Sequence, residues 1–161
     1  MCSSDLRPLA QIYESMGDKA LAAETLAAVP AESASPRLLG DLAVLYLSLA
    51  RYPDAAGVFR RLLSTDPDHG LVAQHGLTFC MIKSQNWRGA LDVALDTIKL
   101  DRYDLTTHFL AYAKDRLFSR VPDAERVEAD LRDRLIAELR EHAELHGDDE
   151  AAGREEGMPG V

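Results

Sequence analysis

A spacing of about 34 residues recurs along this chain and constrains its fold more than any other feature of the sequence. Small residues stand at Ala22, Ala55, Ala90 and Ala124, at intervals of 33, 35 and 34 residues. Two further sets keep the same intervals: Leu9, Leu42, Leu77 and Ala111, and the turn residues Gly17, Ala50, Gln85 and Ser119. A period near 34 residues with two helical segments per unit predicts a solenoid of stacked helix pairs.

The stretch RYPDAAGVFRRLLSTDP, residues 51–67, shows how one helix of a unit begins and ends. Pro53 stands near the predicted start, where a proline is tolerated because its missing N–H has no partner in the first turn. Val58, Phe59 and Leu62 then follow at helical spacing. Pro67 ends the segment, because a proline inside a helix costs about 3 kcal/mol.

The repeat at residues 36–69 carries the fullest pattern: Leu42-Ala43, Tyr46, Tyr52, Ala55, Phe59, Leu62 and Pro67. These residues resemble the tetratricopeptide repeat (TPR) family, and weaker copies fall at about 3–35, 71–104 and 105–138. The last copy departs from the pattern, with Tyr112 in place of a small residue and Glu128 in place of an apolar one. The resemblance implies an all-α fold, a right-handed α-solenoid of antiparallel helix pairs with its array at 7–123.

Small residues are expected where two helices cross closely, about 8–10 Å apart, which accounts for Ala22, Ala55 and Ala90. Trp87 occupies a position that is normally an aromatic plug in the core. From Ala124 the pattern predicts a helix to about residue 146, with an apolar stripe at Val127, Leu131, Leu135 and Leu139. We interpret 124–146 as a C-terminal capping helix and 147–161, with five acids against one arginine, as a disordered tail.

The first six residues, MCSSDL, raise a question of origin. One reverse translation, GTG-TGC-TCT-TCC-GAT-CT, matches the end of a common sequencing adapter. We therefore interpret residues 1–6 as an adapter artefact fused to a truncated bacterial reading frame. Under this hypothesis further repeats, or a catalytic domain, would precede Arg7. A true short N-terminus is the alternative.

Charge and composition argue against several classes of partner. The net charge is −9 with a pI near 5.0, whereas nucleic-acid binding draws on clustered Lys and Arg. No apolar run approaches the ~20 residues of a membrane span, and no secretory signal is visible. We therefore expect a cytoplasmic protein with no nucleic-acid and no membrane partner. Two cysteines, Cys2 and Cys80, are too few for a disulfide framework.

The sequence contains no phosphate-binding glycine loop and no G-x-S-x-G nucleophile motif. Cys80 lies in the apolar run LTFCMI, which favours a buried thiol. His142 and His146 are four residues apart at an acidic helix end, a weak pattern for zinc. His75 and His108 could meet in a groove, as polar contacts or as a ligand pair. We expect no metal, no cofactor and no enzymatic activity.

The resemblance implies that the first helix of each repeat lines a concave groove that holds a peptide or a partner helix. The groove residues carried over are Val44, Leu47, Val72, His75, Phe79, Ile82, Lys83, Phe109 and Arg116. The carboxylate clamp of some relatives is not expected, since its positions hold Arg7, Gln11, Asp41, Val72 and Gly76. Apolar residues prevail, which favours a helix or hydrophobic segment as the ligand.

Besides binding another protein, this groove has three alternative occupants: missing upstream repeats, the helix at 124–146, or a second copy of the chain. We expect a partner in any of these cases, because a large exposed apolar patch is unusual in a monomer. The predicted function is a protein–protein interaction scaffold or adaptor. The alternative is that the chain forms the non-catalytic C-terminal region of a larger bacterial transferase or hydrolase.

Overall fold

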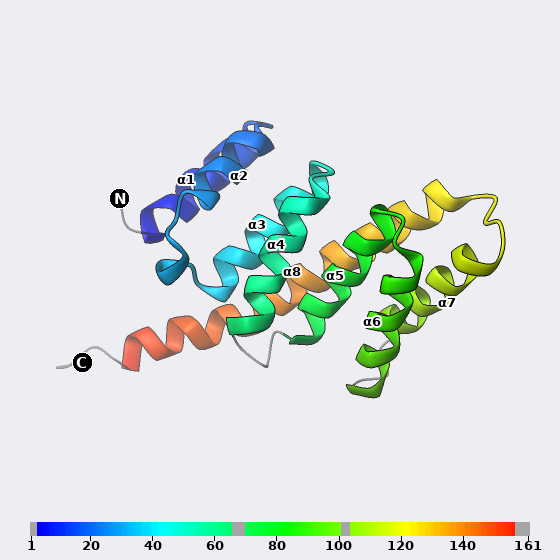
Figure 1. Cartoon of the computed structure of the whole chain (residues 1–161). Coiled ribbons are helices and arrows are strands. Elements are labelled where there is room, and N and C mark those ends of the chain that lie inside the picture. Colours follow the sequence, from blue (N-terminus) through cyan, green and yellow to red (C-terminus); the bar gives the residue numbers. More distant parts are fainter. Residues whose placement is uncertain (1–2, 66–69, 101–103, 157–161) are drawn as a thin grey trace.

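The structure, a computed structural model, describes residues 3–65, 70–100 and 104–156. Its helices are α1 (Ser3–Ser15), α2 (Lys19–Ala27), α3 (Pro36–Ser48), α4 (Tyr52–Thr65), α5 (Gly70–Lys83), α6 (Trp87–Leu100), α7 (Asp104–Phe118) and α8 (Ala124–Glu156), with a 3-10 turn at Ala31–Ser33 (Figure 1). The predicted all-α class is confirmed over this part of the chain. Pro67, the expected end of the second repeat, lies outside the described residues.

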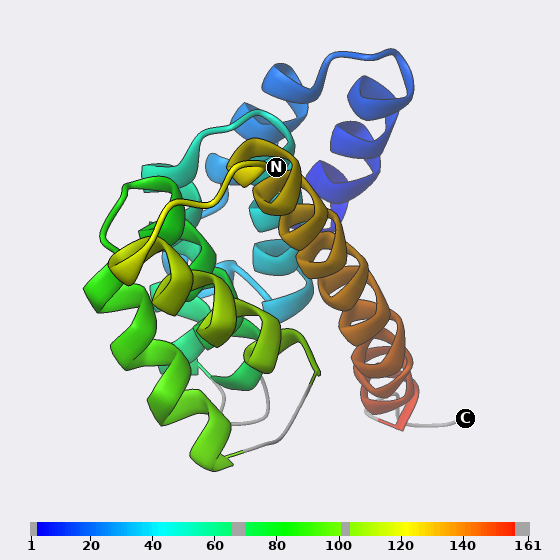
Figure 2. The ribbon, with the colours of Figure 1, turned by 90° about the vertical axis from the view of Figure 1, so that its right-hand side faces the viewer.

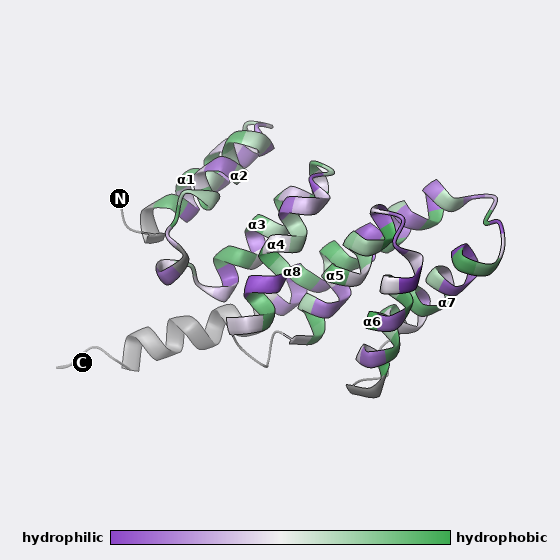
Figure 3. Cartoon of the chain, viewed as in Figure 1, coloured by the Kyte–Doolittle hydropathy of each residue, from purple (hydrophilic) through white to green (hydrophobic). Residues whose placement is uncertain are grey.

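Helices that follow one another in the chain pack side by side from α1 to α7, as expected for a helical repeat. Ala22, Ala55 and Ala90 are 0% exposed, which confirms them as positions of close packing. Figure 3 shows apolar and polar residues alternating along these helices, as amphipathic packing requires. The apolar residues that become buried form one core cluster running through the array.

The turns inside the first three helix pairs share one backbone geometry. Gly17, Ala50 and Gln85 adopt positive φ angles of 84°, 59° and 63°. At each turn this residue's N–H donates to the carbonyl three residues back, and the next N–H donates to the carbonyl five residues back. These are the two hydrogen bonds of a Schellman helix end. The predicted equivalence of the three turn positions is therefore confirmed.

The region predicted as a fourth repeat, 105–138, differs from the other three. At Ser119 the backbone N–H donates to Asp115 O, a bond of the helical i to i−4 type, and the chain runs through 119–123 before α8 begins. Whereas Leu9, Leu42 and Leu77 are buried or partly buried, Ala111 is exposed, and its neighbour Tyr112 is buried instead. The helix after this turn therefore follows a different course from α2, α4 and α6.

Helix α8 turns back along the array and packs against α3, α5 and α7, the first helices of their pairs (Figures 1 and 2). The predicted capping helix begins at Ala124 as expected, but it covers this face rather than the end of the array. Its apolar stripe at Leu131, Leu135 and Leu139 is buried there, in one core cluster with apolar residues of α3, α5 and α7.

The same helix continues to Glu156, ten residues past the predicted end at 146, and so includes 147–156 of the segment expected to be disordered. Gly147, Asp148, Asp149 and Gly153 are poor helix formers, so the added turns extend a helix that is already formed rather than follow from the composition of the segment. Residues 157–161 lie outside the described residues. At the other end of the chain, Ser3 to Leu6 of the segment interpreted as an adapter artefact form the start of α1, and residues 1–2 are not described.

Candidate functional site

The predicted groove residues lie on α3, α5 and α7, and most of them are buried. Exposed fractions are 0–1% for Leu47, His75, Phe79, Ile82 and Phe109, and 6–7% for Val72 and Val44. We use "groove" for the face of α3, α5 and α7 that carries these seven residues. The six apolar members belong to the same core cluster as three leucines of α8, and His75 is bonded to Glu138 of that helix. The groove is therefore filled by the chain's own last helix.

The apolar stripe of α8 provides the contact. Leu131, Leu135 and Leu139 are 2%, 0% and 4% exposed, one turn of helix apart. On the opposite side of the helix, Asp130 and Arg134 form an exposed ion pair at 3.0 Å. Fully burying a leucine side chain contributes about 1.5–3 kcal/mol, so these three residues hold α8 firmly against the groove.

Glu138 of α8 meets a buried histidine of the groove. Its Oε1 and Oε2 lie 2.8 and 2.9 Å from Nδ1 of His75, whose side chain is 1% exposed. The other ring nitrogen, Nε2, forms a hydrogen bond with Thr106 Oγ1 of α7. In the neutral tautomer that fits these partners, Nδ1–H donates to the carboxylate and Nε2 accepts from the hydroxyl. One imidazole thus links α5, α7 and α8.

Glu128 of α8 meets a second pair of groups on the same two helices. Its Oε1 lies 2.8 Å from Nζ of Lys83, and its Oε2 accepts a hydrogen bond from the hydroxyl of Tyr112. Burial, with the carboxylate alongside, raises the pKa of the Tyr112 hydroxyl, which therefore stays a donor at neutral pH. Lys83 also lies 5.5 Å from the ring centre of Tyr52.

Sequence reasoning found two of the six residues of this site. It identified His75 and Lys83 but missed their partners Thr106, Tyr112, Glu128 and Glu138. A signal was present for two of these four residues. Tyr112 and Glu128 are the positions at which the fourth repeat departs from the pattern, and the structure shows them bonded to each other.

Arg116, a further predicted groove residue, packs against Trp87. The Arg116 guanidinium stacks 4.4 Å from the ring centre of Trp87, which also meets the ring of Tyr112 edge-on at 6.3 Å. Trp87 is partly buried and packs against the core, in agreement with its predicted place.

His108 is exposed, and both ring nitrogens of His75 are engaged elsewhere. The two histidines therefore do not form a pair.

Two of the positions considered for a carboxylate clamp, Arg7 and Asp41, form an ion pair with each other. Arg7 Nε lies 3.0 Å from Asp41 Oδ2, so the cation is paired within the chain. No group of three or more His, Cys, Asp or Glu side chains is placed to hold a metal ion within the part of the chain that the structure describes. Of the candidate zinc pair, the side chain of His146 lies outside the described residues.

Helix α8 does not fill the groove completely. A cleft of about 270 Å³ remains between it and the helices beneath. Its lining consists of Tyr52, Phe79 and Lys83 on one side and Glu125, Glu128, Ala129 and Arg132 of α8 on the other. The floor of the cleft thus combines two aromatic rings with a cation.

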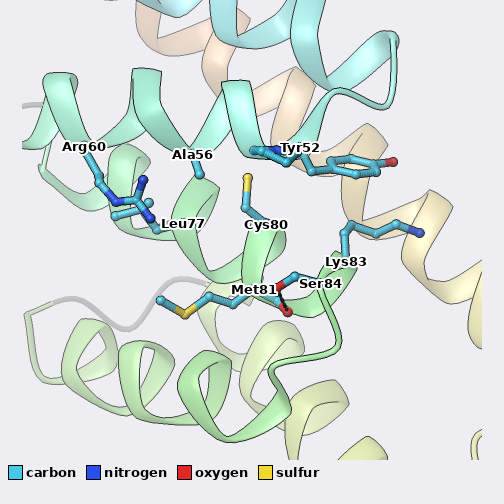
Figure 4. Close-up of a pocket in the computed structure, with 9 residues that line it drawn as sticks. Tyr52, Ala56, Arg60, Leu77, Cys80, Met81, Lys83 and Ser84 are labelled. Atoms are coloured by element: carbon cyan, nitrogen blue, oxygen red, sulfur yellow. Dashed lines mark hydrogen bonds between the residues drawn. The ribbon is translucent and has the colours of Figure 1, made fainter.

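A second pocket, of about 350 Å³, opens between α4 and α5 and shares Tyr52 and Lys83 with that cleft (Figure 4). Cys80 lines it beside Ala56, with Arg60 toward the other end. Burial raises the pKa of the Cys80 thiol to about 12, which keeps it protonated at neutral pH. The pocket can accept an apolar side chain, but its thiol is a poor nucleophile.

Comparison with known proteins gives no assignment: no family model matches this chain, and no curated protein matches it either. Any functional conclusion therefore depends on the repeat pattern and on the geometry of the groove. Over the residues searched, the structure has no helix with both the length and the hydrophobicity that a membrane crossing requires.

Proposed function

We propose that this chain is a protein–protein interaction module, a cytoplasmic scaffold or adaptor whose groove binds an amphipathic helix. We propose further that α1 to α7 form a tetratricopeptide-like array with a right-handed superhelical path. The repeated spacing, the buried alanines and the three matching turns support this assignment. In the state described here the groove is closed by α8.

One observation carries the proposal: the groove already holds a helix. Helix α8 inserts three leucines and two glutamates between α3, α5 and α7, which is the helix-in-groove mode of recognition. It reaches the groove through a connection of five residues, 119–123, that is largely exposed. A helix joined in this way is a separable element, so another helix with the same contacts can take its place.

The ionisable groups of the groove support binding rather than catalysis. His75 and Glu138 are the pair best suited to acid–base chemistry, and they are bonded to each other across the α5–α8 contact. His75 and Thr106 are 1% and 0% exposed, so a substrate has no access to them while α8 is seated. In this state both groups serve to hold a helix.

The proposal is tested by making α8 exchangeable. A protease recognition sequence is inserted between Ser119 and Arg120, the chain is cleaved, and a fluorescent peptide of residues 122–146 is added. We expect fluorescence anisotropy to report replacement of α8 by the peptide, with the helicity of the remaining chain retained. If cleavage unfolds the chain, or if α8 never exchanges, α8 is a permanent part of the core and the proposal fails.

A further inference from the structure

We propose that the groove selects acidic amphipathic helices with carboxylates at the two positions held by Glu128 and Glu138. A larger apolar side chain at the position of Ala129 is one of the added contacts by which a partner outcompetes α8. This inference rests on the proposed helix-binding function and specifies the partner's chemistry. The recognition pattern, read from α8, is Glu-x2-Leu-x3-Leu-x2-Glu-Leu.

The five residues of this pattern lie on one side of α8. With 3.6 residues per turn, positions 128, 131, 135, 138 and 139 fall within an arc of about 100° around the helix. The two glutamates are ten positions apart in the sequence, which places them about 15 Å apart along the axis. A helix that presents this face thus brings both carboxylates to the groove together with its leucines.

Glu128 is bound by two groups from two different helices, and Glu138 is bound by one group that a second helix holds in place. Glu128 binds Lys83 of α5 and Tyr112 of α7. Glu138 binds His75 of α5, and His75 is bonded in turn to Thr106 of α7. Each of these four side chains carries an N–H or O–H group that can donate a hydrogen bond, whereas a carboxylate only accepts. An apolar or basic residue in either place would leave a buried donor without its acceptor, and a glutamine would keep one acceptor oxygen but lose the negative charge.

The positive charge of Lys83 strengthens the preference of the groove for a carboxylate. Lys83 is the cation at the Glu128 site, with its side chain 27% exposed against 10% for the glutamate. Hydrogen bonds to charged partners at partly buried sites are stronger than neutral ones. A lysine or arginine at this position of a partner helix would instead face Lys83 with like charge. The groove therefore discriminates between helices by charge as well as by hydrophobicity.

A partner must also compete with a tethered rival. The five-residue connection, 119–123, keeps α8 at an effective concentration in the millimolar range. A partner at micromolar concentration therefore has to bind about a thousandfold more tightly than a free peptide of α8. Additional contacts beyond those of α8 must supply this difference.

The cleft beside Ala129 is where such contacts are available. It measures about 270 Å³ and places Tyr52 and Phe79 opposite α8. Ala129 is too small to reach across it, whereas a methionine or leucine side chain at that position extends into the space. Lys83 lines the same cleft and holds Glu128, one position before Ala129 on the helix. Acid recognition and cleft filling thus act on adjacent residues of the partner.

The test uses the cleaved chain described above, with all residues present, and competing peptides of residues 122–146. We compare the unchanged peptide with three variants: Glu128→Gln plus Glu138→Gln, Ala129→Met, and Glu141→Gln. Glu141 is exposed and serves as the matched control for loss of one negative charge. The chain itself is not altered between measurements, so a failure to fold does not enter the comparison.

We expect the double glutamine peptide to bind about tenfold or more weakly, the methionine peptide about tenfold more tightly, and the control within twofold of the unchanged peptide. If the double glutamine and unchanged peptides bind equally, the carboxylate selection is overturned while the helix-binding function stands. If the methionine peptide binds no better, the role of the cleft is overturned. If no peptide exchanges with α8, the proposed function itself fails.

Discussion

Single residues at the helix ends carry measurable strain in this chain. Ala50 and Gln85 adopt φ angles of 59° and 63°, in the left-handed region that favours glycine, and Gly17 occupies the equivalent place in the first turn. The left-handed conformation costs a residue with a side chain about 1–2 kcal/mol. A glycine at these positions would avoid this cost but would lose more backbone entropy on folding, so the net gain in stability would be smaller than the full cost.

Replacing these two residues by glycine should therefore stabilise the fold. We expect Ala50→Gly and Gln85→Gly each to raise the free energy of unfolding by about 0.5–1 kcal/mol, measured by urea denaturation. Ser119→Gly is the matched control, because its N–H makes an i to i−4 bond rather than the bonds of the other turns. An equal gain at all three positions would contradict the distinction drawn between the turns.

The Cys80 thiol should be nearly inert in the folded chain. Burial raises its pKa from the reference value of 9.0 to about 12, so its thiolate fraction at pH 8 falls about a thousandfold. In a Cys2→Ser chain we expect a disulfide reagent to give no rapid reaction at pH 8, and full reaction after addition of urea. Rapid reaction of the folded chain would show that the pocket between α4 and α5 exposes the sulfur.

Packing between helices depends on a glycine at one close contact. A Cβ atom added to Gly76 of α5 would lie 2.3 Å from the ring of Phe59, which is 0% exposed on α4. By contrast, a Cβ atom added to Gly57 of α4 would meet nothing within 4 Å. A side chain thus has room at Gly57 but none at Gly76, although the two glycines lie in neighbouring helices.

We expect Gly76→Ala to lower the free energy of unfolding by about 1–3 kcal/mol, because the Phe59 ring must shift within a packed core. Gly57→Ala should raise it by about 0.5–1 kcal/mol, since alanine is the better helix former and the site is open. Thermal unfolding of the two variants under the same conditions checks both signs. A neutral Gly76→Ala variant would mean that α4 and α5 can separate without cost.

Helix positions and turns were within reach of the sequence, and the course of α8 was not. The spacing of Ala22, Ala55 and Ala90 predicts the close packing because two backbones can approach only at small residues. The stripe at Leu131, Leu135 and Leu139 predicts an apolar face, but a periodic stripe does not specify which surface covers it. The helix could pair with α7, cap the array or fill the groove with the same pattern.

The polar contacts of the groove were harder still to predict. His75 and Glu138 are 63 residues apart, and nothing in their separation follows the 34-residue period. Their contact exists only because α8 turns back over α5. Tyr112 and Glu128 did stand out, since each breaks the pattern of its repeat. In a repetitive chain, a residue that departs from its repeat is thus a guide to contacts that the repeat does not predict.

The molecule as a whole combines two kinds of organisation. From α1 to α7 each helix packs on its neighbour in sequence, whereas α8 packs not only on its neighbour α7 but also on α3 and α5, across long stretches of chain. Local contacts of the first kind support cooperative units along an array. The contacts of the second kind all involve α8, and a cleft of about 270 Å³ lies beneath this helix. Stability in such a molecule is not uniform, and α8 is the element that should open first.

Hydrogen exchange measures this order of opening directly. We expect the backbone amides of α8 between Val127 and Glu141 to exchange through an opening of lower free energy, and weaker denaturant dependence, than those of α4. Leu135→Ala should speed exchange in α8 about thirtyfold or more, since removing a fully buried leucine side chain costs about 2–5 kcal/mol. Glu141→Ala, at an exposed position of the same helix, should leave it unchanged. Equal protection and equal denaturant dependence in α8 and α4 would mean that the chain unfolds as one unit, in which case α8 cannot be a replaceable ligand of its own groove.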